Sequence, residues 1–261
     1  MRFARLNLIK KEVQTAVLGI TVLAAFSTPV SAQPPGLVVS VAASLNEALV
    51  EIAELYRAAT GVTVALNTGG SNTLARQIVE GAPAGLFLSA DDLQMDVVEK
   101  AGRVVSGTRT RLLTNELAVI VPGGTRPAVT LSDVLQGRVL RIAMGEPTAV
   151  PAGVYARRWL EAQKAWDRVA PRVVPFPTVR AVLAAVEAGR VDAGIVYRTD
   201  ALTSSVRVVA RLARSDHPYL DIALPAAVIR GPHEAEARRF LEFLHRPQAR
   251  AVFIARGFGI P

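Results

Sequence analysis

The chain has 261 residues, of which 51% are hydrophobic, 20% are charged and none is cysteine, and its formal net charge is +8. This length and apolar content predict a globular protein with one large or two modest domains, and they exclude a disordered chain. The absence of cysteine excludes disulfides, thiol nucleophiles and cysteine-ligated metal centres. A positive net charge is typical of proteins that bind nucleic acids or membrane surfaces, but only if the basic residues are clustered. The distribution of the basic residues along the chain therefore tests this interpretation.

The first 32 residues have the three parts of a secretory signal peptide. Four basic residues between Arg2 and Lys11 precede an apolar run over residues 16–26, and the small residues Val30-Ser31-Ala32 follow. The apolar run is too short for a membrane span, which needs about 20 residues. We therefore predict cleavage after Ala32 and export to a bacterial periplasm. The removed segment contains four basic residues and one acidic residue, so the net charge falls from +8 to +5.

The mature chain alternates strand-length apolar runs with amphipathic helical patterns. Strands are predicted at residues 37–42, 62–66, 86–89, 117–121, 139–143, 172–174 and 193–197. Helices are predicted at residues 45–56, 73–80, 93–100, 131–135, 152–163 and 180–188. This alternation indicates βαβ units and an α/β fold with mostly parallel sheets flanked by helices.

Residues that open or cap helices stand at four strand-to-helix junctions. Ser44 and Glu47 have the spacing of a capping box, and Ser71 follows Gly69-Gly70 as a second predicted cap. Pro151 and Thr178 stand at the starts of two later helices. Helix N-termini carry free N–H groups and partial positive charge, so several that converge would suit an anion. The spacing of these residues in the sequence does not show whether the four helix N-termini converge.

Six segments in chain order resemble the periplasmic molybdate-binding proteins of ABC importers, which are type II periplasmic solute-binding proteins. They are residues 42–45, 70–78, 81–84 with 87–91, 150–156, 178–180 and 192–201, and the resemblance runs from about residue 38 to residue 258. It implies a two-lobed α/β fold with mixed, mostly parallel sheets flanked by helices and with the ligand cleft between the lobes. It places residues 33–115 and 221–261 in lobe 1 and residues 116–220 in lobe 2.

The resemblance also implies the ligand groups for a tetrahedral oxyanion. They are the hydroxyls or amides of Ser44 and Ser71, the amides of Ala152 and Val179, and the hydroxyl of Tyr197. No side chain is expected to coordinate a metal cation directly, and no cofactor is expected besides the molybdate or tungstate ligand. Gly85 departs from the family pattern, which usually has aspartate there.

All five implied groups can donate hydrogen bonds, and none is an obligate acceptor such as a carboxylate. A protonated anion such as hydrogen phosphate would bury an O–H without an acceptor, at a cost of about 1–3 kcal/mol. Molybdate, tungstate and sulfate are fully deprotonated at neutral pH and therefore fit a site that has only hydrogen-bond donors. Together with this chemistry, the resemblance implies a monomeric extracytoplasmic protein that captures molybdate or tungstate for a membrane permease and ATPase.

The alternatives are a binding protein for another oxyanion such as sulfate, and an envelope serine hydrolase. The chain has no G-x-S-x-G, H-E-x-x-H or phosphate-loop motif, so we expect no enzyme. Its basic residues are scattered, and the pairs Arg157-Arg158 and Arg238-Arg239 have acidic neighbours. This distribution predicts no nucleic-acid partner.

Overall fold

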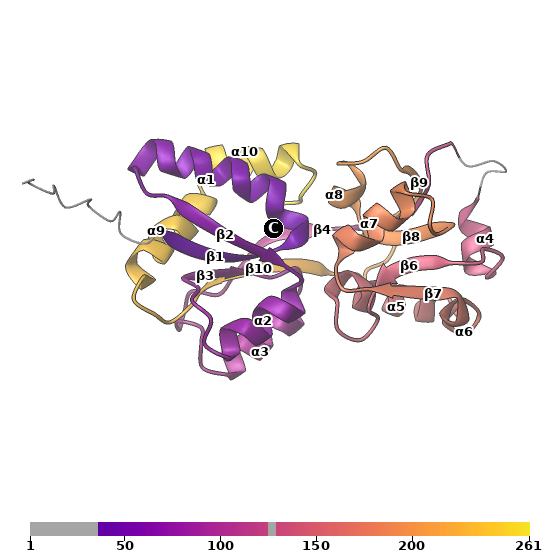
Figure 1. Ribbon diagram of the computed structural model, residues 1–261, viewed down its shortest axis with the longest axis horizontal. Coiled ribbons are helices and arrows are strands. Elements are labelled where there is room, and N and C mark those ends of the chain that lie inside the picture. The colour runs from indigo at the N-terminus through magenta and orange to yellow at the C-terminus, as the bar shows by residue number, and fades with distance from the viewer. Residues whose placement is uncertain (1–35, 125–128) are drawn as a thin grey trace, which may run out of the picture. The chain divides into compact units, whose positions relative to one another are not determined.

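The computed structural model describes residues 36–124 and 129–261, and in this part of the chain two five-stranded sheets organise the fold (Figure 1). The predicted signal peptide therefore lies outside the described residues. The described residues belong to one compact unit. No helix within these residues has the length and apolar character that crossing a membrane requires.

The first sheet has the strand order β2-β1-β3-β10-β4. Its strands are β1 (Leu37–Ala42), β2 (Val64–Gly69), β3 (Leu86–Leu88), β4 (Thr110–Asn115) and β10 (Ile222–Val228). Its helices are η1 (Ala43–Leu45), α1 (Asn46–Thr60), α2 (Ser71–Val79), α3 (Asp92–Lys100), α9 (Glu234–Leu244) and α10 (Pro247–Ala255). Helices α1 and α10 cover one face of this sheet and α2 and α3 cover the other (Figure 1). We call this group of elements the first lobe.

The second sheet has the order β7-β6-β8-β5-β9. Its strands are β5 (Leu117–Val121), β6 (Ile142–Gly145), β7 (Val173–Phe176), β8 (Ala193–Tyr197) and β9 (Arg207–Leu212). Its helices are α4 (Leu131–Leu135), α5 (Pro151–Ala162), α6 (Trp166–Val169), η2 (Ala170–Arg172), α7 (Val179–Glu187) and α8 (Arg198–Ala201). Helices α5 and α7 contact β6 and β8. We call this group the second lobe.

In each sheet four of the five strands run in one direction. Strand β10 is antiparallel to both of its neighbours, β3 and β4, while β1 is parallel to β2 and β3. Strand β5 is likewise antiparallel to β8 and β9, while β6 is parallel to β7 and β8. The predicted α/β class with mixed, mostly parallel sheets is confirmed.

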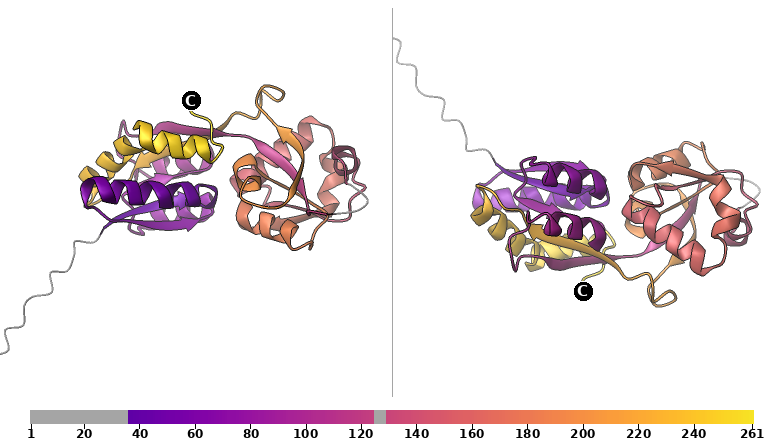
Figure 2. Two further views of the ribbon diagram at one scale, coloured as in Figure 1. Left: turned by 90° about the horizontal axis from the view of Figure 1, so that it is seen from above. Right: turned by 90° about the horizontal axis from the view of Figure 1, so that it is seen from below.

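The chain passes between the sheets twice. Only Glu116 separates β4 from β5, and residues 213–221 join β9 to β10 (Figure 2). The lobe boundaries at 115/116 and 220/221 remain a prediction.

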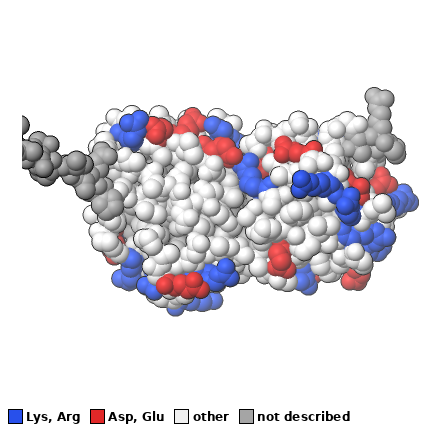
Figure 3. Space-filling view, viewed as in Figure 1, with Lys and Arg blue, Asp and Glu red and all other residues white. Residues whose placement is uncertain are grey.

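Charged side chains of both signs are intermixed on the face of the molecule drawn in Figure 3. Arg109, for example, bonds Asp92, Asp96 and Glu99 at 2.6–2.7 Å. Such local pairing reduces the long-range field that the net positive charge would otherwise produce.

Candidate functional site

A small cavity lies at the junctions between strands and helices of both lobes. It has a volume of about 20 Å³ and is lined by Ala42, Ala43, Ser44, Gly69, Gly70, Ser71, Ala90, Val150, Pro151, Ala152, Thr178, Val179 and Tyr197. These residues follow or end strands β1, β2, β3, β6, β7 and β8, at the carboxyl edges where ligands bind in open α/β sheets. All five predicted ligand residues line this one cavity, and their exposed fractions lie between 0% and 5%.

Ser44 is a buried hydroxyl without a partner. It lies in the 3₁₀ turn η1, and its Oγ has no hydrogen-bond partner in the described structure. The predicted capping box is wrong, because Leu45 is the N-cap of α1 and Glu47 instead bonds Arg180. Since an unpaired buried hydroxyl costs about 1–3 kcal/mol, its retention next to a cavity points to a ligand as the missing partner.

Ser71 presents a hydroxyl whose proton is free. It is the first residue of α2, two residues before the predicted start, and Gly70 is the N-cap. The Ser71 Oγ accepts a hydrogen bond of 3.0 Å from the Ala90 N–H. A hydroxyl that already accepts from a fixed backbone donor keeps its own O–H available. The interpretation of Ser71 as a cap is therefore wrong, but its position suits a donor to the cavity.

The N-termini of α5 and α7 supply backbone donors from the second lobe. Pro151 begins α5 as predicted, and Val154 makes the first helical hydrogen bond, to Val150. Ala152 therefore has an N–H that the helix does not use. Thr178 caps α7 as predicted, accepting from the Ala181 N–H at 3.1 Å, and leaves the Val179 N–H unused by the helix.

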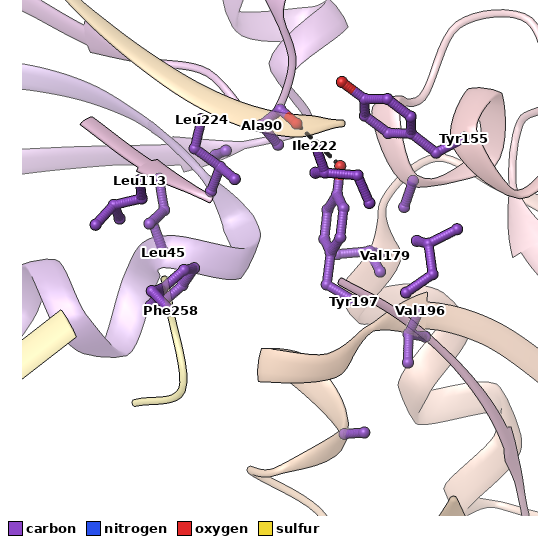
Figure 4. Packing of buried hydrophobic residues seen from close by; sticks show 14 of the residues in the cluster. Leu45, Ala90, Leu113, Tyr155, Val179, Val196, Tyr197, Ile222, Leu224 and Phe258 are labelled. Carbon is purple, nitrogen blue, oxygen red and sulfur yellow. Dashed lines mark hydrogen bonds between the residues drawn. The ribbon is translucent and has the colours of Figure 1, made fainter. Parts of the chain in front are cut away.

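Tyr197 ends β8 and connects the two lobes. Its hydroxyl donates a hydrogen bond of 3.0 Å to the Ala90 carbonyl of the first lobe (Figure 4). Burial raises the pKa of Tyr197 well above its usual value, so the phenol stays protonated. Ser71, Ala90 and Tyr197 thus form one hydrogen-bonded chain across the cavity.

Ala90 is a lining residue that the sequence analysis did not name as a ligand group. Its N–H and carbonyl orient Ser71 and Tyr197 respectively. It lies two residues past β3, where the sequence Ser89-Ala90-Asp91 marks another strand-to-helix junction. Asp91 caps α3 through the Gln94 N–H, so the cap signal at this junction could have identified it.

No charged side chain is among the residues that line the cavity in the described chain. Arg76 is exposed, and Arg180 points to Glu47 and Asp200. The buried carboxyl nearest in sequence to the lining is Asp91, whose pKa burial raises to about 6. The cavity therefore offers neutral donors and helix N-termini.

Gly85 does not line this cavity. A Cβ at this position would lie 2.5 Å from Leu37 Cδ1, so the Leu37 side chain occupies the space that a larger residue would need. The departure of Gly85 from the family pattern is thus a matter of local packing in the first lobe.

Asp200 makes stability dependent on pH. It is fully buried, and burial raises its pKa from 3.8 to about 7 despite the opposing charge of Arg180. The native state therefore binds this proton more tightly than the unfolded state, and the free energy of unfolding should fall as pH rises from about 4 to about 7. Relative to the wild type, Asp200→Asn should gain stability over that window, on the order of a few kcal/mol. Urea unfolding at pH 4 to 8 measures this difference, and a constant difference would contradict it.

The two-lobed fold and the donor-lined cavity between strand ends define a class of protein, the solute-binding proteins. Residues 37–259 match the family described as bacterial extracellular solute-binding proteins. The molybdate-binding protein ModA of Escherichia coli is 38% identical over 230 residues, which are 86% of this chain and 89% of that protein. The chain belongs to this family of bacterial extracellular solute-binding proteins.

Two solved structures are similar to this chain. The substrate-binding domain of a putative molybdenum ABC transporter from Clostridium difficile is 33% identical, with a TM-score of 0.67 over 87% of this chain and 99% of that chain. The periplasmic molybdate-binding protein of Azotobacter vinelandii has a TM-score of 0.77 at 23% identity, over 86% of this chain and 99% of that chain, which supports the fold.

Proposed function

We propose that the protein binds molybdate or tungstate in this cavity and delivers it to the permease and ATPase of an ABC importer. The observation that carries the proposal is that Ser44, Ser71, Ala152, Val179 and Tyr197 line one cavity with no charged residue among its lining. The similarity to proteins that bind molybdate supports the same ligand. The oxyanion is the cargo, and no cofactor is required.

The proposed binding mode uses hydrogen bonds from both lobes. Ser44 and Ser71 would donate from the first lobe, and the amides of Ala152 and Val179 from the second. Tyr197 would turn its proton from the Ala90 carbonyl to the anion. Because a cavity of about 20 Å³ has room for little more than one water molecule, we expect the lining groups to separate as a tetrahedral oxyanion enters.

The domain and cellular assignments complete the proposal. Residues 33–115 and 221–261 would form one lobe and residues 116–220 the other, with the two passages between the sheets as the hinge. The family is extracellular, which supports a periplasmic location. Export would follow cleavage after Ala32, and the mature protein would act as a monomer without catalytic activity.

Titration calorimetry of the mature protein tests the function. We expect binding of molybdate and tungstate, and weaker binding of sulfate and of hydrogen phosphate, because no carboxylate lines the cavity to accept the phosphate proton. Absence of binding to both metal oxyanions would refute the proposal. A preference for sulfate would favour the alternative oxyanion.

The hydrolase alternative requires a base near a serine. His217, His233 and His245 do not line the cavity in the described chain. A serine-directed probe that labelled Ser44 or Ser71 would nevertheless restore this alternative.

A further inference from the structure

An ion pair joins the two segments that carry proposed ligand groups from opposite lobes. The Arg180 Nη2 donates to the Glu47 Oε2. Arg180 directly follows Val179 in the first turn of α7, and Glu47 lies three residues after Ser44 in the first turn of α1. Helix α7 also packs against η1, which contains Ser44.

Contacts within the second lobe hold Arg180 in place for this pairing. Its Nε lies 2.9 Å from the Asp200 Oδ1, and its Nη1 donates to the Thr203 Oγ1 at 2.9 Å. The Thr203 hydroxyl in turn donates to the Asp200 carbonyl at 2.8 Å. Asp200 is fully buried, and an ionised carboxylate there would need the guanidinium as counter-charge. The Thr203 hydrogen bond and the nearby Asp200 carboxyl therefore hold the Arg180 guanidinium on the second lobe, where Glu47 of the first lobe can pair with it.

Neither Glu47 nor Arg180 lines the cavity. Their effect on an oxyanion would be exerted through the positions of Ser44 and Val179, which each lie within three residues of the pair. An ion pair between lobes stabilises only the arrangement in which both segments are close. It would therefore oppose the separation of the lobes that ligand release requires.

We propose that Arg180 is a positioning residue for oxyanion binding, which, through its ion pair with Glu47, keeps the segments that carry the Ser44 hydroxyl and the Val179 amide close enough for one anion to contact both. This proposal rests on the proposed function. It assigns an affinity-determining role to a charged pair outside the ligand shell, and it predicts that the pair acts mainly on the rate of ligand release.

The test compares Glu47→Gln with Glu51→Gln in the mature protein. Glu51 lies one turn further along α1 and pairs at 2.8 Å with Arg256, the residue that follows α10, and both of these residues belong to the first lobe. The two glutamates have similar exposure, 37% and 48% for their side chains. The variants therefore remove the same charge from the same helix, and only one of them breaks a contact between lobes.

We expect Glu47→Gln to weaken molybdate binding about three- to tenfold, mainly through faster release in stopped-flow displacement, and Glu51→Gln to leave both quantities unchanged. The direction of the change in affinity distinguishes positioning from long-range electrostatics. Loss of a negative charge would by itself strengthen binding of an anion, so long-range electrostatics predicts the opposite direction. Arg180→Lys keeps the positive charge but cannot hold Glu47 and Asp200 together, and it should also weaken binding.

The outcomes separate this proposal from the proposed function. If the wild type binds neither molybdate nor tungstate, the proposed function fails and the positioning role fails with it. If the wild type binds and Glu47→Gln binds and releases the anion equally well, only the positioning role is refuted. Equal weakening by Glu47→Gln and Glu51→Gln would also refute it.

Discussion

A Ser44→Ala variant is expected to bind molybdate about ten- to a hundredfold more weakly than the wild type, with no loss of thermal stability. A hydrogen bond to a charged partner contributes about 1.5–3 kcal/mol, and each 1.4 kcal/mol changes the dissociation constant about tenfold. In the described structure the Ser44 Oγ is buried and unpaired, so its removal leaves no hydrogen-bond partner unsatisfied. Calorimetry and thermal melting of the ligand-free protein measure the two effects.

The Ser71→Ala variant should differ from Ser44→Ala in its thermal stability. It should weaken binding to a similar degree, but it also removes the acceptor of the buried Ala90 N–H. An unpaired buried N–H costs about 1–3 kcal/mol, so this variant should melt at a lower temperature.

The exposed Ser106, which lies between α3 and β4, provides the control. Ser106→Ala should match the wild type in binding and in melting. If Ser44→Ala and Ser71→Ala bound molybdate as the wild type does, the assignment of these serines as ligands would be wrong.

Gly153→Ala should destabilise the protein by about 1–3 kcal/mol or more and should also weaken anion binding. A Cβ on Gly153 would lie 2.2 Å from the carbonyl oxygen of Gly145, which is backbone and cannot turn aside. Helix α5 must therefore move away from β6, and the Ala152 amide moves with it. Although alanine has the higher helix propensity, by about 1 kcal/mol, the steric conflict outweighs this gain.

Gly231→Ala is the matched control, because a Cβ there has no neighbour within 4 Å. Urea unfolding and calorimetry of both variants give the comparison. A Gly153→Ala protein as stable as Gly231→Ala would show that α5 and β6 do not approach as closely as the structure indicates.

Much of the secondary structure could be predicted from local patterns. The buried runs of β1, β5 and β8 and the helix α4 have the predicted bounds, and Gly61 ends α1 in the left-handed conformation that favours glycine. Strand β2 starts and ends later than predicted because parallel pairing with β1 extends it from Val64 to Gly69. The hydrophobic run alone could not show where that partner begins.

The prediction missed β4, β9 and β10. Strand β10 contains Pro225 at an irregular point of its pairing with β4, and proline in a run argues against a strand unless it lies at such a bulge. In β4 and β9, arginines interrupt the apolar pattern, and β9 is an edge strand with exposed residues. Pairing partners distant in sequence stabilise these three strands.

The sequence by itself determined the α/β class, the helix starts at Pro151 and Thr178, and the resemblance that named five ligand residues, because these depend on local residue order. Only the tertiary structure decided that those five residues line one cavity, that Ser44 is an unpaired hydroxyl and not a cap, and that Glu47 pairs with Arg180. The reason is physical. Glu47 and Arg180 are 133 residues apart, and only the folding of two sheets brings the carboxyl ends of their strands together.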